Sequence, residues 1–274
     1  MNHPEPASTK KPPQHSAPHP LPEKVGYWND NLDAGNLGRE QAFDFATERK
    51  FFLGPEGAYA LSELGAIKGQ RILDLGCGLG VASLILAQGG AHVVALDPAP
   101  RRIDQLHQHA ATLGLSASVQ PLLGSAEAIP LPDASVDAVF TKSVLIHTDL
   151  PTAIREIKRV LKPGGRAVFL EPLAHNPFVN LYRQLLAPAQ WKGITQYFTE
   201  QRVATLRQAF PISRERRFFV FGFGAFVFQF ALRQPLLFHT TVALTQLIDQ
   251  PLLTLLPPTR RLAWFVVITG RTPT

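Results

Sequence analysis

Short apolar runs alternate with amphipathic segments through the middle of the chain. Runs of strand length are each followed by a segment whose apolar residues recur every three or four positions, as on one face of a helix. The repeated strand–helix alternation predicts a parallel sheet with right-handed crossovers. The expected strands are 71–75, 91–97, 118–124, 136–141 and 166–172, and the expected helices between them are 81–88, 101–114 and 150–161.

The pattern changes toward both ends of the chain. Residues 1–22 are rich in Pro, His and Ser with few bulky apolar residues, which predicts a disordered tail. Helix is expected over 42–64, with an interruption at Gly54-Pro55. Pro121 predicts that the third strand lies at a sheet edge, because proline cannot donate to a central ladder.

The last hundred residues give helices over 178–186, 197–210 and 235–256 and a final strand over 262–270. The Phe-rich stretch 218–232 is uncharged but shorter than the ~20 residues that a membrane span needs. Its glycines and many phenylalanines favour strand and loop.

The sequence DLGCGLG at 74–80 carries the most informative chemistry. A strand that runs through a glycine turn into a helix places backbone N–H groups beside a ligand. Val81 stands where a dinucleotide fingerprint has its last glycine, and Asp74 would repel a phosphate but attract an ammonium or sulfonium group. The alternative is a glycine turn that only reverses the chain, with Asp74 as a capping residue.

This motif resembles the first motif of the class I S-adenosylmethionine (SAM) dependent methyltransferases, in particular the small-molecule group related to quinone-biosynthesis methyltransferases. The resemblance covers 26–165 well and becomes loose after about Asn180. It implies a Rossmann-like α/β fold with a seven-stranded sheet, an antiparallel last strand, helices on both faces and a C-terminal substrate-lid insertion. It also implies SAM as the cofactor.

The resemblance assigns cofactor contacts residue by residue. The amino-acid part of SAM falls to Asp74 and the turn, the ribose to the segment at Asp97, and the adenine to a turn after the third strand. Relatives mostly have Asp where this chain has Ser125, so that contact is less certain. The implied set is Tyr27, Asp74, Gly76, Cys77, Gly78, Gly80, Asp97, Pro98, Ser125, Ala126, Glu127, Lys142, Ser143 and His147.

Several of these residues have simpler explanations. Asp97 stands about 20 residues after the turn, where a carboxylate accepts from ribose hydroxyls, but it also precedes Pro98 as a turn residue would. Tyr27 belongs either to a lid over the cofactor or to simple packing. Cys77 is read as a small side chain in a tight turn rather than as a reactive thiol.

The catalytic residue is not fixed by the sequence. The candidate general bases are His147, His175 and His239, and the alternative for His147 is that it caps or packs the next helix. No carboxylate–histidine cluster suggests a metal. A SAM methyltransferase mainly positions its acceptor, so the binding residues are easier to predict than the catalytic ones.

Charge is unevenly distributed. The net charge is +6, with −1 over residues 1–200 (18 basic, 19 acidic) and +7 over residues 201–274 (9 basic, 2 acidic). A basic region attracts nucleic acid, anionic membrane or an anionic substrate, or is simply solvated. No nucleic-acid-binding module is present, so nucleic acid is not expected as a partner. One cysteine and no secretory signal indicate a cytoplasmic protein, with peripheral membrane contact through the basic, apolar C-terminal part as an added prediction.

Together these observations predict methyl transfer to a hydrophobic small molecule, such as a quinone, polyketide, terpenoid or lipid, at O first and C second. The alternatives are an inactive SAM-fold scaffold protein and a nicotinamide-dependent oxidoreductase. A monomer and a homodimer stay equally open. The expected segments are the tail (1–22), an N-terminal helical lid (23–66), the SAM-binding core (67–172) and an acceptor-binding part with the final strands (173–274).

Overall fold

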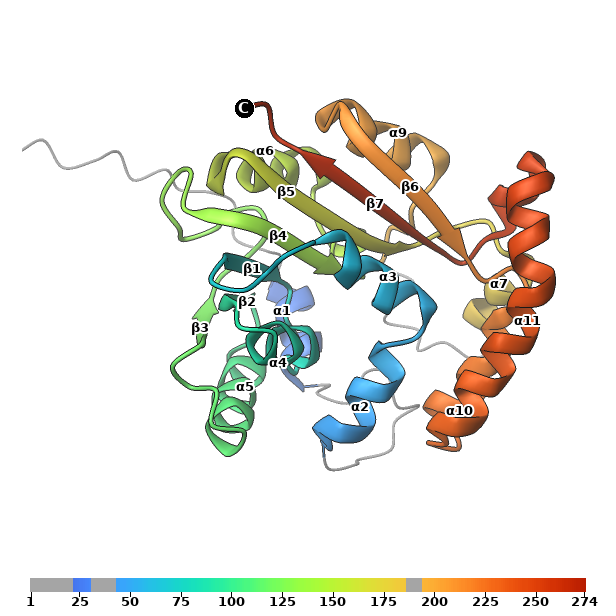
Figure 1. Cartoon of the computed structure of the whole chain (residues 1–274), viewed down its shortest axis with the longest axis horizontal. Coiled ribbons are helices and arrows are strands. Elements are labelled where there is room, and N and C mark those ends of the chain that lie inside the picture. The colour runs from blue at the N-terminus through green and yellow to red at the C-terminus, as the bar shows by residue number, and fades with distance from the viewer. Residues whose placement is uncertain (1–21, 31–42, 186–193) are drawn as a thin grey trace, which may run out of the picture.

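The computed structural model describes residues 22–30, 43–185 and 194–274. Its centre is one seven-stranded sheet with the order β3-β2-β1-β4-β5-β7-β6 (Figure 1). The predicted disordered tail, except Pro22, lies outside the described residues. The strands are β1 Arg71–Leu75, β2 His92–Asp97, β3 Val119–Leu123, β4 Val136–Lys142, β5 Leu161–Pro172, β6 Ile212–Phe218 and β7 Phe265–Arg271.

The strand directions confirm the predicted Rossmann-like sheet. β1 to β5 are parallel, and β7 inserts antiparallel between β5 and β6. β3 is an edge strand and contains Pro121, as predicted. The chain turns outward from β1 toward β2 on one side and β4 on the other, so the carboxyl ends of these strands form the crevice where such sheets bind ligands.

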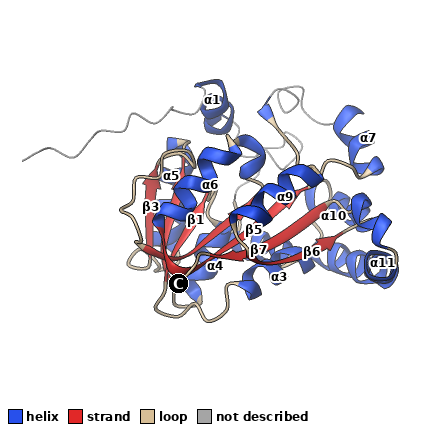
Figure 2. Cartoon of the chain, turned by 90° about the horizontal axis from the view of Figure 1, so that it is seen from above, coloured by secondary structure: helices blue, strands red, loops and turns tan. Residues whose placement is uncertain are grey.

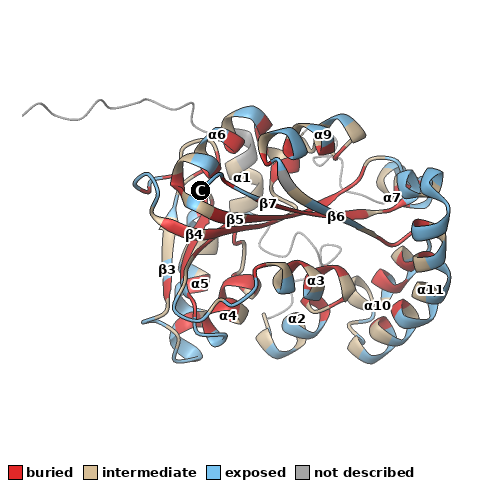
Figure 3. Cartoon of the chain, turned by 45° about the horizontal axis from the view of Figure 1, so that its top comes forward, coloured by how far each residue is buried: buried red, intermediate tan, exposed pale blue. Residues whose placement is uncertain are grey.

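Helices cover both faces of the sheet (Figure 2). α6 and α9 share one buried core with the sheet, and α2 to α5, α10 and α11 share the other. The strands are buried between them (Figure 3). The helices are α1 Pro22–Asp30, α2 Phe45–Phe52, α3 Pro55–Glu63, α4 Val81–Gln88, α5 Pro100–Thr112, α6 Leu150–Val160, α7 Pro177–Leu185, α9 Glu200–Ala209, α10 Phe226–Phe230 and α11 Pro235–Leu255, with 3-10 turns η1 Leu145–His147, η2 Gly222–Ala225 and η3 Pro257–Leu262.

The Phe-rich stretch 218–232 differs from the sequence prediction. Its first residue ends β6 and residues 219–221 and 231–232 lie in loops and turns, as expected, but residues 222–230 form η2 and α10. The cause is distant in sequence, because the carboxylate of Asp249 on α11 accepts from the backbone N–H groups of 220, 221 and 222 at 2.9–3.1 Å. These bonds take the N–H groups that a continuing strand would need.

The segment after β5 contributes β6, which the sequence pattern did not single out. Its residues 212–218 pair along the whole of β7 and close the sheet on that side. Among the described residues, no helix is long and apolar enough to cross a membrane.

Candidate cofactor-binding site

The glycine turn between β1 and α4 requires glycine at three positions for two different reasons. Gly76, Gly78 and Gly80 have φ of +72°, +55° and +87°, values that side chains disfavour. A Cβ on Gly76 would meet Val144 Cγ2 at 2.4 Å, and one on Gly80 would meet Leu106 Cδ1 at 2.1 Å. A Cβ on Gly78 would meet only Arg102 Nη1, at 3.6 Å. The space above Gly78 therefore accepts a close ligand, whereas its two neighbours are glycine because of protein packing.

Two buried carboxylates lie beside this turn. Asp74 accepts from Ser83 Oγ at 2.6 Å, and burial raises its pKa to about 6. Asp97 accepts from the backbone N–H groups of Gly78 and Ala99, both at 3.0 Å. Burial raises the pKa of Asp97, and the nearby Arg102 guanidinium opposes that shift. The Gly78 bond joins the glycine turn to the end of β2.

Arg102 is a site residue that the sequence prediction missed. It lies on α5, and its Nε donates to the Trp28 carbonyl at 3.1 Å. Its guanidinium also lies 4.7 Å from the centre of the Trp28 ring, a cation–π distance. Within α5 it reads as one more solvated charge, so no local signal marked it.

Helix α1 spans the site from the β2 side to the β4 side. The Trp28 ring contacts Arg102 on one side and the His147 ring on the other, with a 4.9 Å separation of ring centres. Tyr27 packs edge-on against Trp28, also at 4.9 Å. The aromatic pair at the N-terminus is thus brought to the glycine turn, with Trp28 rather than Tyr27 making both bridging contacts.

His147 lies in η1, after β4. Its Nδ1 lies 3.1 Å from the Ile194 carbonyl oxygen. A carbonyl oxygen only accepts, so Nδ1 carries the proton and Nε2 is the basic nitrogen of the neutral ring. Of the three histidine candidates, only His147 is on an element that borders the glycine turn, through Val144.

Glu171, at the end of β5, is a second residue that the sequence prediction missed. Its Oε1 accepts from Thr141 Oγ1 and the N–H groups of Val144 and Leu145, at 3.1–3.2 Å. Its Oε2 is buried without a hydrogen-bond partner among the described residues, and burial raises the pKa of the carboxyl to about 7. Glu171 therefore fixes the loop that packs on Gly76. A lone carboxylate in an apolar strand was its sequence signal, as it was for Asp74.

Some of the remaining predicted cofactor contacts adjoin the site, and others contact neighbouring helices. The turn 125–127 follows β3, and its neighbour Gly124 donates to the Asp97 carbonyl at 3.2 Å, so this turn adjoins the site. Ser125 and Ala126 are buried there, while Glu127 accepts from the Asp149 N–H at the start of α6. Pro98 follows Asp97 in the turn into α5.

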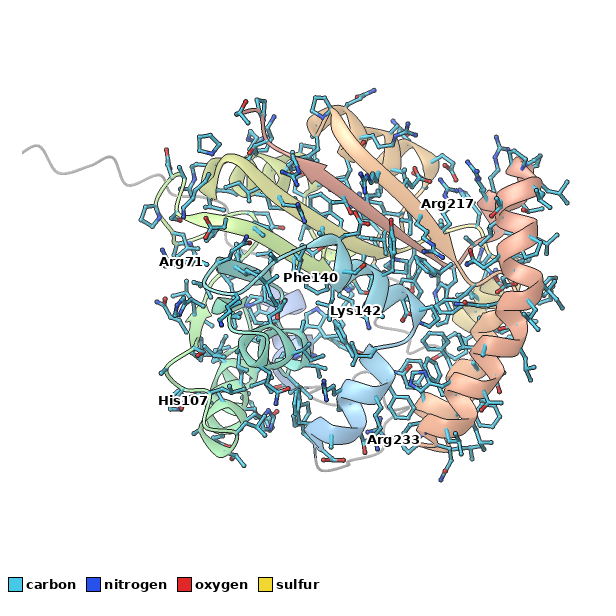
Figure 4. All side chains as sticks on the ribbon, in the orientation of Figure 1. Arg71, His107, Phe140, Lys142, Arg217 and Arg233 are labelled. Carbon is cyan, nitrogen blue, oxygen red and sulfur yellow. The ribbon has the colours of Figure 1, made fainter. Side chains whose placement is uncertain are left out.

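Lys142 and Ser143 end β4 with different orientations. Lys142 Nζ lies 4.2 Å from the centre of the Phe52 ring on α2, and burial lowers the pKa of Lys142, opposed by Glu56 and Glu48. Figure 4 shows this side chain between the sheet and the N-terminal helices. Ser143 has φ +57° and donates its N–H to Leu170, which fixes the start of the loop below the site.

The other two histidines are not brought to the glycine turn. His175 is exposed at the start of α7, and His239 lies on α11, where its Nε2 is 2.9 Å from the Lys50 carbonyl. The described residues contain no group of three or more His, Cys, Asp or Glu that could hold a metal. Burial and the two site aspartates raise the pKa of Cys77 well above its usual range, so its thiol stays protonated and unreactive.

These residues fit a cationic nucleoside cofactor. Buried carboxylates at the ends of β1, β2 and β5 favour positive charge, and the open position over Gly78 admits a close ligand. Asp97, which the sequence predicts to accept from ribose hydroxyls, holds the glycine turn through the Gly78 N–H. A pyrophosphate would meet the Asp74 and Asp97 carboxylates, which argues against a dinucleotide.

Comparison with known proteins agrees with this chemistry. Residues 73–169, from β1 into β5, match the family model described as "Methyltransferase domain". The chain belongs to the class I SAM-dependent methyltransferases. Its cofactor is accordingly S-adenosyl-L-methionine.

Curated relatives of this methyltransferase match mainly through the same segment. A malonyl-[acyl-carrier protein] O-methyltransferase of Serratia marcescens is 40% identical over 37% of this chain and 38% of its own. A ubiquinone biosynthesis O-methyltransferase of Methylocella silvestris is 40% identical over 36% and 38%. An O-methyltransferase of Aspergillus nomiae is 33% identical over 57% and 66%. The chain thus spans between about a third and two thirds of the relatives that it matches.

Solved structures resemble the methyltransferase over nearly its whole length. Geranyl diphosphate C-methyltransferase from Streptomyces coelicolor has a TM-score of 0.59 at 16% identity, covering 93% of this chain and 99% of that one. The [4+2]-cyclase SpnF has a TM-score of 0.58 at 20% identity, covering 94% and 98%. At these identities the likeness concerns the fold, and the different activities named for these two proteins show that the fold alone does not determine the reaction.

Proposed function

We propose that this methyltransferase transfers the methyl group of SAM to a hydrophobic small molecule, at oxygen in the first instance and at carbon as the second choice. The observation that carries the proposal is the contact of Trp28 with both His147 and Arg102, where Arg102 lies beside a glycine turn flanked by buried carboxylates. Relatives named as O-methyltransferases support oxygen, and a structural neighbour named as a C-methyltransferase supports carbon as the alternative.

Asp97, Glu171 and His147 have different roles in the proposed reaction. SAM supplies an activated methyl group on a sulfonium whose thioether is a good leaving group. Asp97 accepts from ribose hydroxyls, and Glu171 holds the loop 143–145 against Gly76. His147, with its proton on Nδ1, receives the acceptor's hydroxyl proton at Nε2 as the new O–C bond forms.

The hydrophobic character of the acceptor rests on the wall beside His147. Ile194, whose carbonyl orients His147, is followed by Tyr197 and Phe198, and the Arg183 guanidinium lies 3.4 Å from the Tyr197 ring centre. Trp28 stands on the other side of His147. The aromatic rings of Trp28 and Tyr197, with the half-buried Arg183 guanidinium over Tyr197, suit a planar or chain-like apolar acceptor that carries an anionic or hydroxyl group.

The test is methyl transfer from SAM to a panel of hydroxyl-bearing acceptors, a hydroxyquinone, a phenol and a fatty acid, with products measured by mass spectrometry. His147→Gln should lower kcat roughly hundredfold, because general base catalysis contributes about that much. Its affinity for S-adenosylhomocysteine should stay within about threefold of wild type.

His239→Gln is the matched control, since both histidines place one ring nitrogen near a backbone carbonyl and only His147 borders the glycine turn. Equal losses in the two variants would contradict the assignment of His147. Cofactor binding without turnover on any acceptor would favour the inactive scaffold protein instead.

A further inference from the structure

Large apolar side chains are exposed almost entirely at one end of the molecule. Of the sixteen exposed large hydrophobic residues in the described chain, fourteen follow residue 173, and the other two are Leu113 and Leu123. They gather on α7, α10, α11 and the turns beside them. Contiguous exposed apolar surface of this kind marks an interaction site.

Helix α11 and its C-cap residue Leu256 provide half of these fourteen side chains. Over its 21 residues the only charged side chain is Asp249, which faces inward and holds the 220–222 turn. The outward side chains are mostly apolar, apart from Thr240 and Thr254, and Leu236, Leu247 and Leu255 are exposed by 76%, 73% and 74%. Figure 3 shows this outer side exposed at the edge of the molecule. We call it the α11 outer face: Leu236, Leu237, Leu244, Leu247, Ile248, Leu255 and Leu256.

Positive charge lies at one end of the α11 outer face. Arg260 and Arg261 follow the helix in η3 and are exposed, and Arg216 of β6 donates to Gln250 at 3.4 Å. At the other end, Arg233 is paired with Glu48, so its charge is compensated. Among the described residues Arg216, Arg260 and Arg261 form no ion pair, so the basic residues whose charge is least compensated lie near the C-terminal half of the apolar face.

The side chains of the α11 outer face favour a lipid bilayer over a folded protein as the partner. A protein–protein interface normally carries about one hydrogen bond per 100–200 Å², which fixes its register. The seven side chains of the α11 outer face are all Leu or Ile, and the polar side chains exposed on the same helix are those of Thr240 and Thr254, so few donors or acceptors are available to fix a register. A bilayer surface needs none: its acyl boundary takes apolar side chains, and anionic headgroups attract arginine.

We propose that the α11 outer face lies in the headgroup region of an anionic lipid bilayer, with Arg260 and Arg261 on the lipid phosphates. The helix then lies along the membrane plane, about 30 Å in length. This inference goes beyond methyl transfer and does not depend on it, because its test measures binding without turnover.

The experiment is co-sedimentation of the full chain with vesicles of phosphatidylcholine alone and with phosphatidylglycerol added, at low and high salt. Wild type should sediment with the anionic vesicles and much less with the neutral ones. Leu244→Asp/Leu247→Asp should weaken binding roughly hundredfold, because two leucines lose their apolar contact. Arg260→Ala/Arg261→Ala should weaken it about tenfold and flatten its salt dependence.

Matched controls come from the other exposed positions. Leu113→Asp/Leu123→Asp changes the two exposed leucines outside this end, and Arg155→Ala/Lys158→Ala removes two exposed basic residues from α6. Both should bind vesicles like wild type. Wild type that stays in the supernatant, or an α11 variant that binds unchanged, would overturn the proposal. So would a concentration-dependent dimer, seen by analytical ultracentrifugation, that the leucine variant abolishes, because a second copy would then cover the face.

Discussion

The glycine-turn region buries charged side chains, whereas the α7–α11 region exposes apolar ones. Around the turn, carboxylates are buried and apolar side chains are covered. At the α11 end, leucines are exposed and the net charge of residues 201–274 is +7, against −1 for residues 1–200. A site built for a small cation needs buried negative charge, whereas a surface for an extended apolar partner needs exposed leucine. The two regions belong to one sheet, but the buried carboxylates and the exposed leucines lie apart from each other.

The largest expected effect is a difference in ligand affinity between variants of two buried aspartates that each hold a turn. Asp97 and Asp249 each accept from backbone N–H groups of a turn, but only Asp97 lies beside Gly78. Asp97→Ala should weaken S-adenosylhomocysteine binding by roughly 3 kcal/mol, about a hundredfold, because it removes the acceptor for the ribose hydroxyls and releases the turn.

Asp249→Ala provides the comparison. It leaves three N–H groups without an acceptor and should lower the free energy of unfolding by roughly 2–3 kcal/mol while the folded fraction binds S-adenosylhomocysteine normally. Isothermal titration and urea unfolding measure the two quantities. The contrast fails if Asp249→Ala loses ligand affinity as strongly as Asp97→Ala.

A smaller effect concerns the pH dependence of stability. The pKa of Asp74 is raised to about 6 and that of Glu171 to about 7, so the native state holds protons that the unfolded chain has released. The stability from these groups is fully present below pH ~4 and is lost as pH rises through about 6 and 7. Their summed contribution should fall by a few kcal/mol between pH 4 and 8, at about 1.4 kcal/mol per unit of pKa shift.

Urea unfolding of wild type and of Asp74→Asn/Glu171→Gln at pH 5 and pH 8 tests this pH dependence. The amides cannot ionise, so the double variant should lose less stability than wild type over that range. Equal losses in the two proteins would mean that neither carboxyl titrates differently in the folded state.

The central α/β core could be predicted because its signals are local. The glycine turn, the alternation of strands and helices, and Pro121 in the third strand all reflect short-range rules, and the structure confirms them. The last strand was correctly expected to be antiparallel through the family resemblance.

The features that the sequence did not reveal depend on contacts between residues far apart in the chain. The phenylalanines of 218–232 suggest a strand, but Asp249, 27–29 residues away, turns the chain there. Arg102 and Trp28 are 74 residues apart and meet only once α1 lies against α5. Glu171 could have been noticed as a lone carboxylate in an apolar strand. Its hydrogen-bond partners, however, lie in the loop after β4, and they come within reach only because β4 pairs with β5.

The most direct test of the cofactor site is titration of S-adenosylhomocysteine into Gly78→Ala and Gly114→Ala. Both glycines have positive φ, +55° and +68°, and both have room for a Cβ, so the two variants carry similar backbone strain. Only Gly78 faces the proposed ligand. We predict that Gly78→Ala weakens binding at least about thirtyfold, roughly 2 kcal/mol, while Gly114→Ala binds like wild type. Wild-type affinity in Gly78→Ala would contradict the cofactor site described above.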